Sequence, residues 1–272
     1  TVVISDTNEN IIDSAYISTS IENSLSRGRT PDGLGSWCFF SPPTPNASND
    51  QSNCYSGVVA APIISLASGW YSAANPITVV TAPNATSYYT TNGDVPDQFD
   101  NVVNGTIYVN SSSILSVRSF DNNGTALPSP TVDRTYIINE DNHDLPVVSI
   151  ITDDDNLWDW YTGIYVMGPN ASTNYPYFGS NFWQPWSRKS RMEFFDGTQT
   201  KQFVAEFDLE IHGGWSRAEP QKSFRVDAKS IYTGDIEYTL IERKPHITRY
   251  NNFSLRNGGQ HGLSDRLQDA IM

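Results

Sequence analysis

Short runs of β-branched and aromatic residues, separated by turn-forming Asn, Gly and Pro, recur along most of this 272-residue chain. Such spacing is typical of antiparallel β structure. The 18 Gly, the 16 Pro and an aromatic content of 12% favour strands and turns over long helices. The sequence therefore predicts a mainly β fold, and its length allows two or three domains with separate cores.

The charge balance bears on the partners of the chain. Lys and Arg number 17 and Asp and Glu number 30, which gives a net charge of −13. Such an acidic chain is not attracted to phosphate backbones or anionic lipids, so we expect no nucleic-acid partner. We also expect no membrane span, because no apolar run approaches the roughly 18–20 residues that cross a bilayer. Because no basic region followed by an apolar one opens the sequence, we expect this piece to lack its targeting signal.

Two cysteines, Cys38 and Cys54, lie in a stretch rich in Ser, Asn and Pro. Two thiols are too few for a structural zinc site, so this spacing favours a disulfide that closes a loop. The low lysine content, the acidic balance and the abundance of Asn, Ser and Thr fit an exported protein whose cysteines can oxidise. We therefore expect a secreted or cell-surface location.

Residues 1–58 begin with an expected hairpin, TVVIS and IIDSAYIS, followed by a turn at Pro31 and a short strand, WCFF. The stretch from Ser26 to Asn46 resembles the C-terminal end of a lamin-tail immunoglobulin-like domain. A sandwich of this kind takes about 100 residues, so the resemblance implies that about half of it precedes Thr1. The alternative is a small independent β module.

Residues 60–138 show short expected strands at regular spacing, as in a β-sandwich. The string GWYSAANPITVVTAPNATSYYTTNGDVPD resembles the small Ig-like module related to the chitobiase C-terminal domain. The resemblance implies a spacer; alternatively, exposed aromatic residues could hold sugar. Tyr88 and Tyr89 face opposite sides of one strand, so at least one belongs to the core. The expected strands are 77–80, 87–90, 106–109, 114–120 and 131–138.

A polar break, NEDNHD at 139–144, precedes the last segment, 145–272. The pattern predicts an acidic turn at 153–156, an aromatic loop at 175–186 and a helix capped near Ser264. Strands followed by a late helix form an α+β pattern. The expected strands are 146–151, 163–166, 189–195, 203–212, 221–228 and 252–256.

Several separated stretches of this segment occur in a characteristic order: LPVVSIITDDDNLWDW, MEFFD, EIHGGWSRAEPQKSFRV and FSLRNGG. In that order and spacing they resemble the N-terminal part of a CotH-type kinase domain. The resemblance implies an atypical kinase-like fold and phosphoryl transfer to protein, with ATP and Mg²⁺ in the complete protein. It also implies an exported bacterial multidomain protein in which lamin-tail, Ig-like and CotH-type modules follow one another.

The glycine-bearing stretch that includes Ser216 is the candidate cofactor-binding element. Gly213 and Gly214 allow the backbone to approach a ligand closely and present N–H groups to an anion. Arg217 and Lys222 could contact phosphate oxygens, one as a planar fork and the other as a compact charge. By itself the motif favours plain turn chemistry; the resemblance points to a lysine on the nucleotide phosphates.

The position of Lys222 in the expected strand is compatible with two placements of its side chain. It shares a strand face with Phe224 and Val226, which are apolar. It therefore lies at the edge of a cleft or extends outward from the core.

A kinase also needs carboxylates that orient the acceptor and hold Mg²⁺. The resemblance implies that these lie beyond residue 272, so we expect residues 1–272 to be inactive alone. Asp265 and Asp269, four residues apart on the expected helix, are better explained as solvated surface groups. The expected partners are the remaining N- and C-terminal parts of the same chain and other cell-surface or secretion proteins.

Metal sites are weakly indicated. The run Asp153 to Asn156 could supply oxygen ligands to Ca²⁺, but it lacks the Gly and Glu of an EF-hand loop, so a capped turn is favoured. The aromatic loop could stack on sugar rings, although packing over a sheet is favoured. The histidines lack zinc-ligand spacing. They are His143, His212, His246 and His261.

The leading hypothesis is an exported bacterial surface or secreted protein with a CotH-type protein kinase domain. The alternative is a noncatalytic adhesive, carbohydrate-binding or scaffold protein whose CotH-type domain is a pseudokinase. Sequence beyond residue 272 would discriminate between them, because a kinase must supply two well-placed aspartates there.

Overall fold

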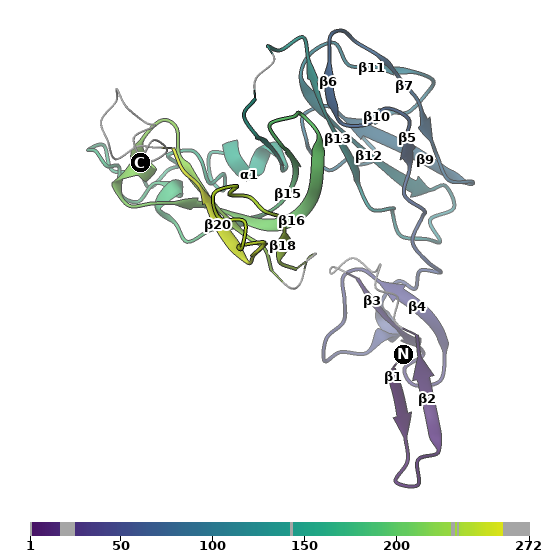
Figure 1. The fold of residues 1–272 in the computed structure, drawn as a ribbon. Helices are drawn as coiled ribbons and strands as arrows, with labels where there is room; N and C mark the ends of the chain where they lie inside the picture. Colours follow the sequence, from purple (N-terminus) through teal and green to yellow (C-terminus); the bar gives the residue numbers. More distant parts are fainter. Residues whose placement is uncertain (1, 17–24, 142–143, 230–231, 233, 258–272) are drawn as a thin grey trace.

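The computed structural model describes residues 2–16, 25–141, 144–229, 232 and 234–257. The fold is mainly β, as the composition predicts, with a single five-residue α-helix in the described part of the chain. Three sheet-bearing units follow one another along the sequence. Figure 1 shows the N-terminal hairpin at one end of the molecule, away from the other two units.

The first unit consists of two small antiparallel sheets. The expected hairpin and the expected WCFF strand are both present. Cys38 and Cys54 are joined by a disulfide with a Cα–Cα distance of 5.2 Å. Cys38 and Phe40 are fully buried. The elements are β1 (Val2–Ser5), β2 (Ile11–Ala15), β3 (Ser26–Thr30), β4 (Ser36–Phe40) and the 3₁₀ turn η1 (Asn49–Gln51).

The second unit has a five-stranded sheet in the order β10-β9-β12-β13-β6 and two small two-stranded sheets, β5-β8 and β7-β11. Tyr89 packs against its core, whereas Tyr88 contacts Phe120 on the other side of the strand. The expected strand 77–80 is interrupted. The strands are β5 (Ile63–Ile64), β6 (Gly69–Tyr71), β7 (Pro76–Ile77), β8 (Val79–Val80), β9 (Ala85–Thr90), β10 (Asn101–Val102), β11 (Ile107–Tyr108), β12 (Ser113–Asp121) and β13 (Val132–Ile138).

The third unit is built on an antiparallel sheet in the order β14-β15-β16-β17-β20. The strands β18 and β19, which fall between β17 and β20 in the sequence, form a separate two-stranded sheet. The strands are β14 (Val147–Ile151), β15 (Ser187–Phe195), β16 (Lys201–His212), β17 (Ser223–Asp227), β18 (Ile236–Glu237), β19 (Arg249–Tyr250) and β20 (Asn252–Leu255). The helical segments are α1 (Asp154–Trp158), η2 (Asn181–Trp183) and η3 (Trp215–Ala218).

Two local predictions for this unit were wrong. The expected acidic turn at 153–156 is the start of α1, and the expected strand 163–166 is irregular. The N–H groups of Ile164 and Tyr165 donate to the carbonyls of Asn156 and Leu157, which leaves them no strand partner. The expected helix after Ser264 lies outside the described residues.

One face of the five-stranded sheet forms the core of the third unit. Alternate residues of β16, from Phe203 to Ile211, point to this face and pack with Met192 of β15 and Val226 of β17. The opposite face is polar. It carries Lys189, Arg191, Glu193, Glu206 and Asp208.

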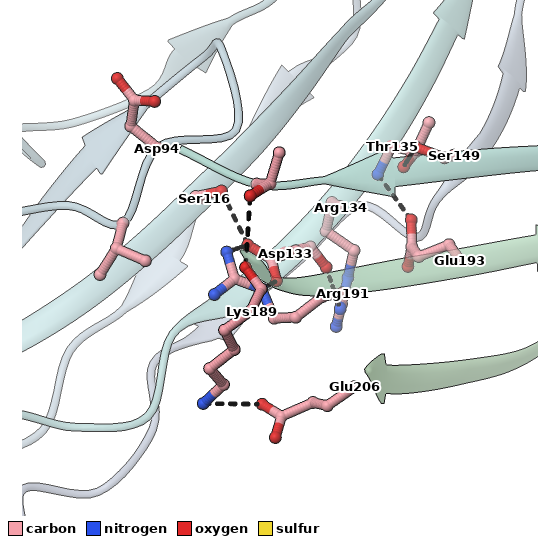
Figure 2. Close-up of polar contacts among 12 residues, drawn as sticks. Asp94, Ser116, Asp133, Arg134, Thr135, Ser149, Lys189, Arg191, Glu193 and Glu206 are labelled. Atoms are coloured by element: carbon pink, nitrogen blue, oxygen red, sulfur yellow. Dashed lines mark hydrogen bonds and ion pairs between the residues drawn. The ribbon is translucent and has the colours of Figure 1, made fainter. Parts of the chain in front are cut away.

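The polar face meets the second unit through a buried carboxylate. Glu193 is only 2% exposed. It accepts hydrogen bonds from the Ser68 hydroxyl at 2.7 Å and from the Thr135 backbone N–H at 2.8 Å. Lys201, from its own unit, donates to the same carboxylate at 2.8 Å. The second unit therefore satisfies a charge that the third unit buries (Figure 2).

A second charged pair lies beside it. Arg191 of β15 contacts both carboxylate oxygens of Asp133 of β13, at 2.5 and 3.2 Å, and Ser116 donates to the same group (Figure 2). Burial raises the pKa of Asp133, and the guanidinium of Arg191 opposes that shift. Polar groups on these two sheets are thus satisfied by each other.

The start of α1 is held by the second unit. Asp94 accepts the Asp154 backbone N–H at 2.6 Å, and Asp153 accepts the Val95 N–H at 2.7 Å. A carboxylate at a helix start satisfies an otherwise orphaned donor. The exchange is reciprocal, so the turn after β9 and the start of α1 hold each other in place.

Candidate functional site

The candidate binding element is the turn between β16 and β17. Gly213 follows β16 with φ of +117°, a conformation that side chains disfavour. A Cβ built on Gly213 would lie 2.5 Å from the Ser216 hydroxyl, which would have to rotate away. Gly214 has open space around its Cα, and the 3₁₀ turn η3 begins directly after it. The two glycines thus make a tight turn that leaves its outer side accessible.

Arg217 ties this turn to the aromatic loop. Its Nε donates to the Gly213 carbonyl at 2.7 Å, and one terminal nitrogen donates to the Phe182 carbonyl at 3.3 Å. The guanidinium also lies 5.8 Å from the centre of the Trp183 ring. Partial burial lowers the pKa of Arg217. Two of its five N–H donors are engaged in these bonds, so donor capacity remains for a ligand.

Lys222 differs from both arrangements expected from the sequence, because its ammonium is buried beneath the turn. It is 8% exposed and donates to the carbonyls of Arg217 and Glu219, at 2.7 and 2.9 Å. Its ammonium lies 3.9 Å from the centre of the Phe182 ring and 5.3 Å from that of Tyr165. Burial lowers its pKa to about 8, an effect that Glu219 partly opposes.

Neither cation is paired with a carboxylate within the part of the chain that the structure describes. The ion pairs found there involve other cations. The hydrogen bonds of Arg217 and Lys222 go to neutral carbonyl oxygens, and Glu210 and Glu219 act on these two cations only from beyond ion-pair distance. Partly desolvated cations attract an anion more strongly than solvated side chains do.

Asn257 completes the turn and was missed in the sequence. It is 7% exposed, and its side-chain amide donates to the Gln221 carbonyl at 2.5 Å. Its oxygen accepts from the Ser223 hydroxyl at 3.0 Å, while its backbone N–H donates back to that hydroxyl at 3.0 Å. Asn257 follows β20 in the quoted stretch FSLRNGG, but a single Asn in a short stretch gives no signal of a contact 36 residues away.

The aromatic loop is partly core and partly surface. Phe182 is 2% exposed and Trp183 packs against the core, as favoured from the sequence. Tyr175 and Phe178, however, are 51% and 55% exposed and contact Trp215 of η3, which is 61% exposed. In this aromatic cluster of Tyr175, Phe178 and Trp215, Trp215 lies on the same turn as the two cations.

The expected metal chemistry has no ligand set here. Among the described residues, no group of three or more His, Cys, Asp or Glu side chains could hold a metal ion. Asp153 is engaged with Val95, and the Asn156 amide donates to Thr152. The run considered for Ca²⁺ is therefore engaged in contacts within the protein. The carboxylates that the resemblance implies for Mg²⁺ are expected beyond residue 272, and no step is assigned to that ion.

The remaining candidates are dispersed. His212 is exposed at the end of β16, and His246 is exposed in the loop before β19. The pair Asp265 and Asp269 lies outside the described residues, as do His143 and His261. No helix in the described part of the chain is long and apolar enough to cross a membrane.

Comparison with known proteins returns no relative. No protein-family model matches the chain, and neither a curated protein nor a solved structure matches it significantly. The resemblances drawn from the sequence therefore stay predictions.

Proposed function

We propose that the third unit is the N-terminal part of a CotH-type phosphotransferase domain and that the turn from Gly213 to Lys222 faces the phosphates of ATP. One observation supports this most: Arg217 and Lys222, on a glycine turn of a chain with net charge −13, are satisfied only by carbonyl oxygens. A phosphate group would supply the missing negative charge.

The two cations have different roles in this proposal. Arg217 has donors to spare and contacts phosphate oxygens directly. Lys222 lies beneath the turn, where it holds the carbonyls of Arg217 and Glu219 inward. The Gly213 carbonyl accepts from the Nε of Arg217, which leaves the amide side of the Gly213–Gly214 segment for an anion. Lys222 reaches the phosphate itself only if the turn rearranges on binding.

The wider proposal is an exported bacterial multidomain protein. In the first unit, β1 and β2 expose aliphatic side chains, which fits a sandwich that other strands of the same protein complete. The exposed residues are Val2, Ile4, Ile11 and Ile12, each more than half exposed. The disulfide between Cys38 and Cys54 fits an oxidising location outside the cytosol.

The test is phosphoryl transfer from γ-labelled ATP by the full-length protein and two variants. Arg217→Ala removes the direct contact, and Lys222→Met removes the buried charge while keeping a long side chain over Phe182. We expect both variants to lose at least about tenfold in transfer rate, since one charge-assisted hydrogen bond is worth roughly 1.5–3 kcal/mol. Lys189→Met, on the far face of the sheet, is the control.

Unchanged transfer by a stably folded Arg217→Ala protein would reject the assignment. Absence of transfer by the wild-type full-length protein would instead favour the noncatalytic alternative, in which the domain is a binding scaffold. Thermal denaturation of each variant separates loss of the site from loss of the fold.

A further inference from the structure

We propose that the aromatic cluster of Tyr175, Phe178 and Trp215 is the platform on which the base of a nucleotide stacks. This inference rests on the proposed phosphate-binding role of the turn, and it adds the residues that would distinguish a nucleotide from a simple phosphate.

The cluster is a surface feature built from two distant segments. Trp215 belongs to η3, while Tyr175 and Phe178 belong to the loop before η2. Its ring contacts are edge-on: Trp215 lies 5.8 Å from Tyr175 and 6.5 Å from Phe178 between ring centres. Such contacts fix the direction of the indole without covering it, so Trp215 remains 61% exposed.

Hydrogen bonds and ring contacts make the platform rigid before any ligand binds. The Tyr175 hydroxyl donates to Glu219 at 3.4 Å, within the same turn. Phe178 lies 4.9 Å from Trp183, which is itself anchored by donating to the Pro176 carbonyl at 2.8 Å. Pre-ordered aromatic side chains lose little conformational entropy when a flat ring stacks on them.

A chain of side-chain contacts connects the aromatic platform to Arg217. The guanidinium of Arg217 lies over Trp183, which contacts Phe178, and Phe178 contacts Trp215. A ligand that uses both parts needs a flat aromatic ring and negative charge a short distance away. A nucleotide has both, whereas a neutral sugar would offer no anion to Arg217.

A binding comparison on the full-length protein tests this inference. ATP and inorganic tripolyphosphate share the phosphate chain, and only ATP carries a base. We expect Trp215→Ala to weaken ATP binding about fivefold or more, because base stacking on an aromatic ring contributes at least that factor. Tripolyphosphate binding should be unchanged. Trp215→Phe should keep most of the ATP affinity, and Trp160→Ala, an equally solvated tryptophan, should change neither ligand.

The outcomes separate the two proposals. If ATP and tripolyphosphate both bind through Arg217 but Trp215→Ala affects them equally or not at all, the platform is wrong and the phosphate site stands. If neither ligand binds in an Arg217-dependent way, the phosphate site and the platform are both wrong.

Discussion

The carboxylate of Glu193, on β15, accepts a hydrogen bond from the backbone N–H of Thr135, on β13 of the preceding unit, at 2.8 Å. Trp70 and Phe195 pack edge-on at 5.2 Å between ring centres across the same junction. The second unit therefore covers the part of the polar face around Glu193, on the sheet whose far end bears the candidate turn. A spacer that merely separated two modules would leave this face to water.

Removing Glu193 should destabilise the second and third units together. In Glu193→Ala the Thr135 N–H and the Ser68 hydroxyl lose their acceptor, and an unsatisfied buried donor costs about 1–3 kcal/mol. Glu206→Ala is the matched control, because Glu206 is more exposed and lies 3.7 Å from Lys189; it should cost less than about 1 kcal/mol. Urea denaturation measures both, and equal losses would contradict a structural role for the junction.

The contributions of Asp94 and Asp153 to the free energy of unfolding should depend on each other. Each accepts an N–H from the other's segment, so Asp94→Ala alone should cost roughly 0.5–2 kcal/mol, the usual loss of a helix cap. Losing either carboxylate loosens the contact that the other makes. We therefore expect Asp94→Ala with Asp153→Ala to cost less than the two single losses added together. Strict additivity in denaturation would show that the two bonds are independent.

Lys222 should make the free energy of unfolding depend on pH in the alkaline range. Its pKa is lowered from 10.5 to about 8 in the folded protein. Between these values the unfolded chain binds a proton that the folded chain does not, so the free energy of unfolding should rise with pH. Below pH 8 both states are charged, and the cost of burial is constant. Lys222→Met should lack this rise when unfolding is measured at pH 7 and pH 9.5, whereas identical pH dependence would place the titration elsewhere.

The disulfide should contribute much of the stability of the first unit. Cys38 and Cys54 close a 16-residue separation, for which loop-closure entropy gives about 3 kcal/mol. Thiol titration in denaturant without reductant should find no free thiol, and reduction should lower the unfolding transition of this unit. Two titratable thiols in the unreduced protein would contradict the bond.

The strands of the five-stranded sheet in the third unit were predictable because burial imposes a period of two on them. The alternating apolar residues Phe203, Phe207 and Ile211 indicate which face of the sheet is the core face. The covered polar face was not predictable, since Arg191 and Glu193 follow the alternation of a sheet exposed to water. The partners that make their burial tolerable, Asp133 and Thr135, lie 58 residues earlier in the chain.

The candidate site was predictable in part. The glycines and the cations of the turn stand close together in the sequence, so their proximity could be inferred. The burial of Lys222 could not, because it depends on Phe182 and Tyr165, which reach it from the aromatic loop and from the segment after α1. The start of α1 was also hidden, since its cap, Asp94, comes from another unit.

The backbone amide signals of Gly213 and Gly214 during titration with tripolyphosphate test the central claim most directly. An anion bound at this turn must accept hydrogen bonds from these amides or lie beside them. We expect both signals to shift saturably in the wild-type protein and to stop shifting in Arg217→Ala, while Gly124, in a turn of the second unit, stays still in both. If Gly213 and Gly214 do not respond, or respond no more than Gly124, the turn does not bind phosphate.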